Sequence, residues 1–154
     1  MDINFSNEDV KLNNSKRIFL AGPTRRNSTF ENSWRNEACK ILKDLGFDGI
    51  VYVPEFSGFN IQFDYDRQVL WERKALENAT IILFWIPRDL KDDMPGFTTN
   101  VEFGMYLARN PEKVILAFPK NADKMQYLDW LYTYETNKTS FHSLKEALIE
   151  AINS

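Results

Sequence analysis

Two glutamates in this sequence are candidates for chemistry, and the first is Glu102, within the segment GFTTNVEFG at residues 96–104. It falls near the start of a predicted helix that follows a strongly apolar strand. The partial positive charge at a helix N-terminus keeps a carboxylate ionised, so Glu102 could act as a nucleophile. Thr99 lies three residues earlier, and this spacing also fits a capping box, in which the glutamate only satisfies a backbone N–H. The two interpretations are compatible with each other.

The second candidate is Glu72, in the segment VLWERKAL at residues 69–76. It lies one helical turn before Leu76 and shares the apolar stripe of a predicted helix. Carboxylates are rarely buried without a partner, so we expect Glu72 either in a buried salt bridge or in a functional site.

The loop after the first apolar block is a candidate anion site. It reads Gly22-Pro23-Thr24-Arg25-Arg26 and precedes a helix start. Backbone amides and arginines in this arrangement suit a phosphate or a carboxylate, and a solvated basic turn is an equally good interpretation. The loop has neither the spacing of a dinucleotide-binding motif nor that of a Walker motif.

Aspartates and aromatic residues surround the most apolar strand. We expect Asp89, Asp92 and Asp93, in the loop that follows it, to be mostly solvated, with one of them reaching the site. Trp85 ends this strand and is expected near the site. Phe97 belongs either to the core or to a wall on which a flat ligand stacks.

The composition excludes several kinds of chemistry. The 154 residues include a single cysteine, Cys39, expected in the core, and a single histidine, His142, expected in a surface or capping role. An internal disulfide, a Cys-rich zinc site and a mechanism with paired histidines are therefore excluded, and we expect neither metal nor cofactor. The net charge of -3 argues against a polymeric nucleic acid as partner. Carboxylates, arginines, hydroxyls and an aromatic content of 14% remain.

The sequence shows no sign of a membrane segment. No apolar run approaches the roughly 18 residues of a spanning helix, and the N-terminus has no signal-peptide core. We therefore expect a cytoplasmic protein without a membrane partner. Residues 1–16 are polar and aperiodic, which predicts an extension that is at best loosely ordered.

Strands alternate with helices along residues 17–154, which are interpreted as one domain. The predicted strands are 17–21, 49–53, 80–86 and 113–118, the predicted helices are 28–45, 64–78, 98–109 and 140–152, and 121–139 is irregular or partly helical. This alternation predicts an α/β fold with a parallel sheet. Ligands of such sheets bind beyond the carboxyl ends of the strands, so the loops at 22–27, 54–63 and 87–99 matter most.

Three blocks of this sequence resemble the nucleoside 2-deoxyribosyltransferase family, and more closely its bacterial and phage deoxyribosyltransferase-like branch. They are IFLAGP at 18–23, a Trp-Glu pair ahead of ATIILFWIPR at 79–88, and TTNVEFG at 98–104. They occur in the family's order, and the likeness covers residues 17–130. It implies a flavodoxin-like, Rossmann-type open sheet with helices on both faces.

The resemblance also implies roles for individual residues. Glu102, followed by Gly104, matches the family's nucleophile, and Glu72 matches an acidic residue that contacts the sugar or the base. The Gly22-Pro23 loop matches the loop that binds sugar and base. Better-known members carry an aspartate directly after the Ile-Pro of the strand, where this chain has Arg88 and then Asp89.

The expected activity is transfer of 2-deoxyribose between nucleobases through a covalent Glu102–deoxyribosyl intermediate. Glu72 would orient the sugar or assist, and Asp89 or a neighbour would protonate the leaving base. The expected substrate-binding residues are Gly22, Pro23, Thr24, Arg25, Trp85, Arg88, Phe97, Thr99 and Asn100. Arg25 and Arg26 resemble the cations of relatives that cleave nucleoside 5′-monophosphates. The alternatives are a nucleoside or nucleotide hydrolase with the same site, and a non-catalytic nucleotide-binding module.

The expected partners are a nucleoside, nucleobase or nucleotide and a second copy of the chain. The aromatic segment at residues 125–134 is the candidate contact between copies, because so many aromatic side chains are unlikely to fit one small core. The resemblance adds that family members usually assemble, with a neighbour's C-terminal segment completing the site.

Overall fold

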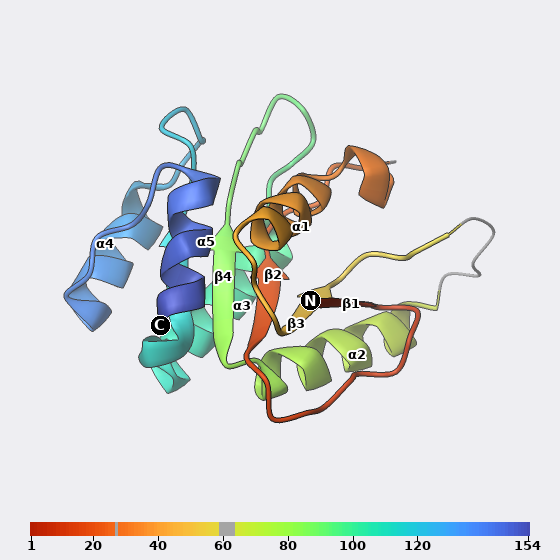
Figure 1. The fold of residues 1–154 in the computed structure, drawn as a ribbon. Coiled ribbons are helices and arrows are strands. Elements are labelled where there is room, and N and C mark those ends of the chain that lie inside the picture. Colours follow the sequence, from red (N-terminus) through yellow and green to blue (C-terminus); the bar gives the residue numbers. More distant parts are fainter. Residues whose placement is uncertain (27, 59–63) are drawn as a thin grey trace.

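The computed structural model describes residues 1–26, 28–58 and 64–154 (Figure 1). Within these residues, five parallel strands form one sheet in the order β1-β3-β2-β4-β5. The strands are β1 (Asp2–Phe5), β2 (Arg17–Ala21), β3 (Ile50–Val53), β4 (Ile81–Trp85) and β5 (Val114–Ala117). The helices are α1 (Trp34–Asp44), α2 (Tyr65–Asn78), α3 (Phe97–Arg109), α4 (Gln126–Thr136) and α5 (Leu144–Asn153), with short 3-10 turns at Phe30–Asn32 and Pro111–Lys113.

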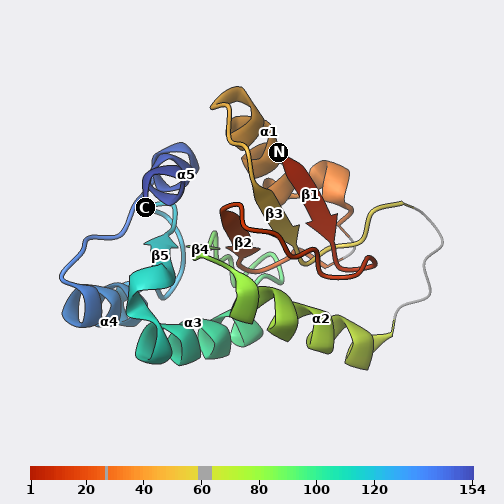
Figure 2. The same cartoon turned by 60° about the horizontal axis from the view of Figure 1, so that its bottom comes forward.

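The helices cover both faces of the sheet. Figure 2 shows α1 and α5 on one face and α2, α3 and α4 on the other. Each face has its own core, because successive side chains of a strand point to opposite sides. Phe84 packs edge-to-face on Phe103 of α3, with ring centroids 5.3 Å apart, whereas the next residue, Trp85, belongs to the core beneath α1 and α5. The fold is the predicted flavodoxin-like α/β sheet.

The strand order opens a crevice at the carboxyl edge of the sheet. β2 lies between β3 and β4, and the chain leaves β2 through α1 on one face, whereas it leaves β4 through α3 on the other. The loops after β2 and β4 therefore diverge, which is the arrangement that holds ligands in open α/β sheets.

The prediction of a loosely ordered N-terminus is wrong, because residues 2–5 form β1. This strand pairs in parallel with β3, from Asp2 opposite Ile50 to Phe5 opposite Val53. The polar sequence concealed it because Asn4 is fully buried with its hydrogen bonds satisfied. The Asn4 amide donates to the Asp9 carbonyl at 3.0 Å and accepts from the Lys11 N–H at 2.8 Å.

Several helix boundaries differ from the prediction. The first helix starts at Trp34, because the Ser33 hydroxyl rather than that of Ser28 caps it, accepting from the Arg35 N–H at 3.1 Å. The last helix starts at Leu144 behind a Ser143 cap. The segment 121–139 contains the regular helix α4. The second helix starts as predicted, with Asp64 as its cap.

Candidate active site

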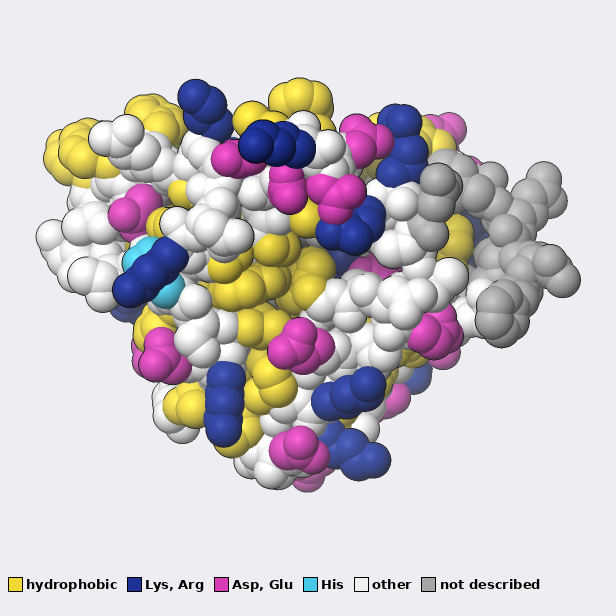
Figure 3. Space-filling model, turned by 90° about the horizontal axis from the view of Figure 1, so that it is seen from above, with side chains coloured by type: hydrophobic (Ala, Val, Ile, Leu, Met, Phe, Trp, Pro, Cys, Tyr) yellow, Lys and Arg dark blue, Asp and Glu magenta, His cyan; other side chains and the backbone are white. Residues whose placement is uncertain are grey.

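A cavity of about 490 Å³ lies at the carboxyl edge of the sheet, between the loop after β2, the start of α3 and the side of α2. Figure 3 views the molecule from this edge and shows acidic and basic side chains side by side over it. Of the predicted site residues, the structure brings together seven at this cavity: Gly22, Pro23, Thr24, Glu72, Phe97, Thr99 and Glu102. Arg26, Arg35, Tyr65, Gln68 and Asp93 also line it. The volume suits a small organic ligand.

Glu102 does not form the predicted capping box. Helix α3 begins at Phe97, since Gly96 takes the left-handed conformation, with φ 66°, at the N-cap. Thr99 is therefore already inside the helix, and Glu102 lies in its second turn. Capping of the helix therefore does not explain the glutamate at this position. The Glu102 side chain instead lines the cavity.

The cavity raises the pKa of both glutamates. Burial raises the pKa of Glu102 to about 7, and the charge of Glu72 adds to this rise. Burial also raises the pKa of Glu72. A hydrogen bond of 2.6 Å from the Gln68 amide has the opposite effect, because it favours the ionised form. The positive charge of Arg35 lowers the pKa of both carboxyls. Two half-buried carboxyl groups in one cavity resist being ionised together.

The loop after β2 is held in a tight conformation. Gly22 has φ 152°, and a Cβ atom there would lie 2.0 Å from the Trp85 carbonyl oxygen, so a side chain is excluded. The carbonyl of the same residue accepts a hydrogen bond of 2.6 Å from Arg35. The loop lines the cavity with Gly22, Pro23, Thr24 and Arg26, but not with Arg25.

The two arginines of this loop face aspartates of the loop between β4 and α3. Arg25 pairs with Asp92 outside the cavity, and Arg26 pairs with Asp93 at 3.3 Å on the cavity edge. All four side chains are largely exposed. Arg26, rather than Arg25, is thus the cation of this pair that a ligand in the cavity would meet.

Trp85 does not line the cavity, because it points to the opposite face of the sheet from Phe84. Arg88 is also absent from the cavity. It is 4% exposed and donates to the Lys124 carbonyl at 3.2 Å and to the Asn100 side chain. Arg88 therefore connects the loop after β4 to the loop before α4 and to the first turn of α3.

Asp89 lies in a turn outside the cavity. Its carboxylate accepts from the Lys91 N–H at 2.9 Å and from the Asp92 N–H at 3.2 Å. These bonds are those of an Asx turn, a local structural role. The expectation that Asp89 protonates a leaving base has no support from its position.

Arg35, like Tyr65 and Gln68, lines the cavity and was missed by sequence reasoning. It lies 1% exposed on the buried side of α1. Ala38, Cys39 and Leu42 follow at helical spacing on the same side. An arginine on an apolar stripe is as unusual as the glutamate on the stripe of α2, and this signal could have singled it out.

A second cavity of about 460 Å³ adjoins the first and shares Thr24, Pro54, Gln68 and Glu72 with it. Phe30 and Phe56 also line it. Gln68 lies on the shared wall, and its Oε1 atom is buried without a hydrogen-bond partner among the described residues. Such an atom is a ready acceptor for a ligand hydroxyl.

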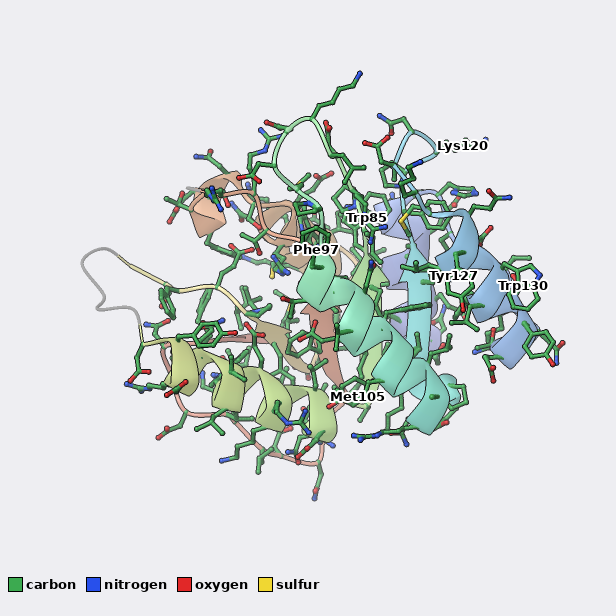
Figure 4. The ribbon with its side chains drawn as sticks, turned by 180° about the vertical axis from the view of Figure 1, so that it is seen from behind. Trp85, Phe97, Met105, Lys120, Tyr127 and Trp130 are labelled. Atoms are coloured by element: carbon green, nitrogen blue, oxygen red, sulfur yellow. The ribbon has the colours of Figure 1, made fainter. Side chains whose placement is uncertain are left out.

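Helix α4 carries an exposed aromatic surface. Tyr127, Trp130 and Tyr134 are 68%, 59% and 68% exposed, and the rings of Trp130 and Tyr134 stack with centroids 5.1 Å apart. Figure 4 shows Tyr127 and Trp130 on α4, beside α3, with Phe97 at the start of α3. The expectation that this helix contacts a second copy stays a prediction.

No described helix combines the length and apolar character needed to cross a membrane. Among the described residues, no group of three or more His, Cys, Asp or Glu side chains is arranged to hold a metal ion.

The parallel sheet, the crevice at its carboxyl edge and two half-buried glutamates define an α/β protein with a cavity suited to nucleophilic and acid–base chemistry. The sequence profile described as "Nucleoside 2-deoxyribosyltransferase like" matches residues 15–121. The chain belongs to this nucleoside 2-deoxyribosyltransferase-like family.

A solved structure supports the fold. A conserved protein from Enterococcus faecalis V583 is similar, with a TM-score of 0.57 and 15% sequence identity over 90% of this chain and 98% of that one. At this identity the similarity shows the fold alone. A comparison with curated proteins finds no match.

Proposed function

We propose that the protein cleaves the N-glycosidic bond of a 2′-deoxynucleoside and transfers the deoxyribose to a second nucleobase. The observation that carries this proposal is the pair of half-buried carboxyl groups in one cavity, each with a raised pKa. Near neutral pH such a pair retains a proton that two separate glutamates would lose. Glycosyl transfer uses this combination, a carboxylate that attacks the sugar and a carboxylic acid that protonates the leaving group.

In the first step, a carboxylate oxygen of Glu102 attacks C1′ of the deoxyribose. The C1′–N bond breaks, and its electron pair stays on the base, which takes up a proton from Glu72. The products are the free base and a deoxyribosyl ester of Glu102. In the second step, a nitrogen of another base attacks C1′, the ester bond breaks to restore the Glu102 carboxylate, and the proton of the attacking nitrogen returns to Glu72.

Glu72 takes the role of acid in this proposal because Asp89 lies outside the cavity. Burial raises the pKa of Glu72, so this carboxyl can hold the proton that attack by an ionised Glu102 requires. The unpartnered Oε1 of Gln68 would accept a hydrogen bond from a sugar hydroxyl. Phe97, 76% exposed on the cavity edge, would stack on the base.

A second candidate, hydrolysis of a nucleoside 5′-monophosphate, is favoured by one observation. Arg26 lies on the cavity edge, where its guanidinium could exchange Asp93 for a phosphate. In this reaction water would take the place of the second base and attack C1′ of the ester. Incubation with a deoxynucleoside 5′-monophosphate and no acceptor base separates the two, because only the hydrolase releases deoxyribose 5-phosphate.

The decisive experiment mixes the protein with a deoxynucleoside and a second base and follows base exchange by chromatography. Mass spectrometry of the intact protein would at the same time detect a deoxyribosyl adduct, located to the peptide that contains Glu102. Glu102→Ala should abolish both signals. Glu77→Gln, which changes an exposed glutamate of α2, should leave them unchanged. Base exchange by Glu102→Ala at the wild-type rate would refute the mechanism.

A non-catalytic nucleotide-binding module gives a different result. It would show equal thermal stabilisation of the wild type and of Glu102→Ala by nucleotides, without turnover by either. The capping box that kept this alternative open at the level of sequence is not formed, since Thr99 lies inside α3.

A further inference from the structure

The first turn of α1 holds each of three successive residues of the loop that lines the cavity. The Trp34 indole N–H donates to the Pro23 carbonyl at 3.1 Å. Arg35 donates through Nη2 to the Gly22 carbonyl at 2.6 Å and through Nη1 to the Thr24 hydroxyl at 2.9 Å. The planar fork of an arginine can bind several acceptors at fixed angles, which a lysine cannot do.

The Arg35 guanidinium is also held by two residues outside this loop, Leu20 and Glu55. Its Nε donates to the Leu20 carbonyl of β2 at 2.9 Å, and Nη1 forms a salt bridge of 2.7 Å with Glu55. Both side chains of this pair are almost completely buried. A buried ion pair is weak support for stability, because desolvation of the two charges offsets their attraction. The position of the charge therefore calls for an explanation beyond folding.

Arg35 shares the cavity with two carboxyl groups. It lines the cavity together with Glu72 and Glu102, and its charge favours the ionised form of each. No other cation lowers the pKa of Glu102 among the described residues. The ionisable side chains around Glu102 are Arg35 from α1, Glu72 and Tyr65 from α2, Tyr106 from α3, and Arg26 and Asp93 from the two loops.

We propose that Arg35 is a positioning residue with two linked tasks: it fixes the Gly22–Thr24 loop at the edge of the cavity, and it supplies the buried positive charge that keeps the Glu72–Glu102 pair partly ionised. The meaning of that charge for catalysis rests on the proposed function. The loop contacts and the effect on ionisation do not, because both exist in the free protein.

The test compares three variants that all disturb the Arg35–Glu55 salt bridge. Arg35→Met removes the charge and the fork, Arg35→Lys keeps the charge without the fork, and Glu55→Gln removes only the partner of Arg35. The titration of Glu102 is followed by NMR of carboxyl-labelled protein, with the signal assigned from Glu102→Gln. Amide hydrogen exchange reports on the loop.

We expect Arg35→Met to raise the titration midpoint of Glu102 above its wild-type value of about 7. Arg35→Lys and Glu55→Gln should not raise it, because both leave a cation in place. Arg35→Lys should still accelerate exchange of the loop amides. An equal rise in Arg35→Met and Glu55→Gln, or no rise in Arg35→Met, overturns the charge role. Unchanged exchange in Arg35→Lys overturns the loop role.

Should Arg35→Met fail to fold, as judged by circular dichroism, Arg35→Gln replaces it, since glutamine retains hydrogen-bonding capacity without charge. Neither readout depends on turnover. A wild-type protein with no glycosidic activity would therefore contradict the proposed function and leave the outcome for Arg35 readable.

Discussion

Glu102 and Glu72 reach one cavity from two neighbouring helices, α3 and α2, on the same face of the sheet. After burial, the charge of Glu72 is the largest cause of the raised pKa of Glu102. Arg35 acts in the opposite direction on both. Ionisation of the two carboxyl groups therefore depends on all three side chains. Removing Glu72 or Arg35 one at a time should shift the pKa of Glu102 in a known direction.

Replacing Glu72 by glutamine should lower the pKa of Glu102 below about 7. The substitution removes the negative charge that opposes ionisation of Glu102. The positive charge of Arg35, which favours ionisation, remains. NMR titration of the Glu102 carboxyl measures this shift directly. Glu77→Gln, an exposed change on the same helix, serves as the control and should leave the midpoint in place. An unchanged midpoint in Glu72→Gln would show that the two carboxyls do not interact.

Glu102→Gln should stabilise the protein at alkaline pH. The pKa of Glu102 rises from an ordinary value of 4.5 when unfolded to about 7 when folded, so the folded state binds its proton more tightly. As the pH rises from 4.5 to about 7, the unfolded chain loses this proton first, and the free energy of unfolding of the wild type falls. Above that window the loss is complete.

The gain from Glu102→Gln should therefore grow through this window and then stay constant, reaching about 3 kcal/mol. Urea unfolding at pH values on either side of the window measures it, with Glu77→Gln as the matched exposed substitution. A gain that is equal at acidic and alkaline pH would mean that removal of the charge is not its cause.

The sequence was sufficient to locate the two glutamates. The unbroken apolar run of β4 predicts an interior parallel strand, and Glu102 follows it in the next helix, so topology alone places Glu102 at the carboxyl edge of the sheet. Glu72 lies on the buried stripe of α2, which can be read from its spacing to Leu76.

The uniform apolarity of the strands concealed the orientation of Trp85. When every residue of a strand is apolar, the pattern does not tell which side chains share a face with α3. Asp89 was misplaced because its loop forms a turn of its own, closed by hydrogen bonds to two backbone amides. β1 escaped prediction because the buried residue at its centre, Asn4, is polar.

Phe97→Ala should weaken binding of the donor nucleoside with little change in fold stability. Phe97 is 76% exposed, so its removal leaves no hole in the core, yet its ring lines the cavity. Loss of a stacking partner for a base weakens binding by about 1–3 kcal/mol, so KM should rise by roughly 5- to 150-fold. Val101→Ala, one turn later on α3 and 69% exposed, lies outside the cavity lining and should leave KM unchanged.

The α4 surface should hold two copies of the chain together. Trp130 and Tyr134 stack on each other while remaining 59% and 68% exposed, and Tyr127 is exposed one turn earlier. Aromatic side chains of this kind form the centre of stable protein interfaces, whereas free surfaces rarely gather them. Sedimentation velocity at micromolar concentration should therefore show the wild type as larger than a monomer.

A double substitution, Trp130→Ser with Tyr134→Ser, should shift the protein to a monomer without unfolding it, because neither side chain is part of the core. Leu70→Ser is the control, since Leu70 is 68% exposed on α2, away from α4. It should preserve the assembly. A monomeric wild type at these concentrations, or assembly that survives the double substitution, would assign the exposed rings of α4 to another use. If base exchange also disappears in a folded monomer, the second copy contributes to the site, because Trp130 and Tyr134 themselves lie outside the cavity lining.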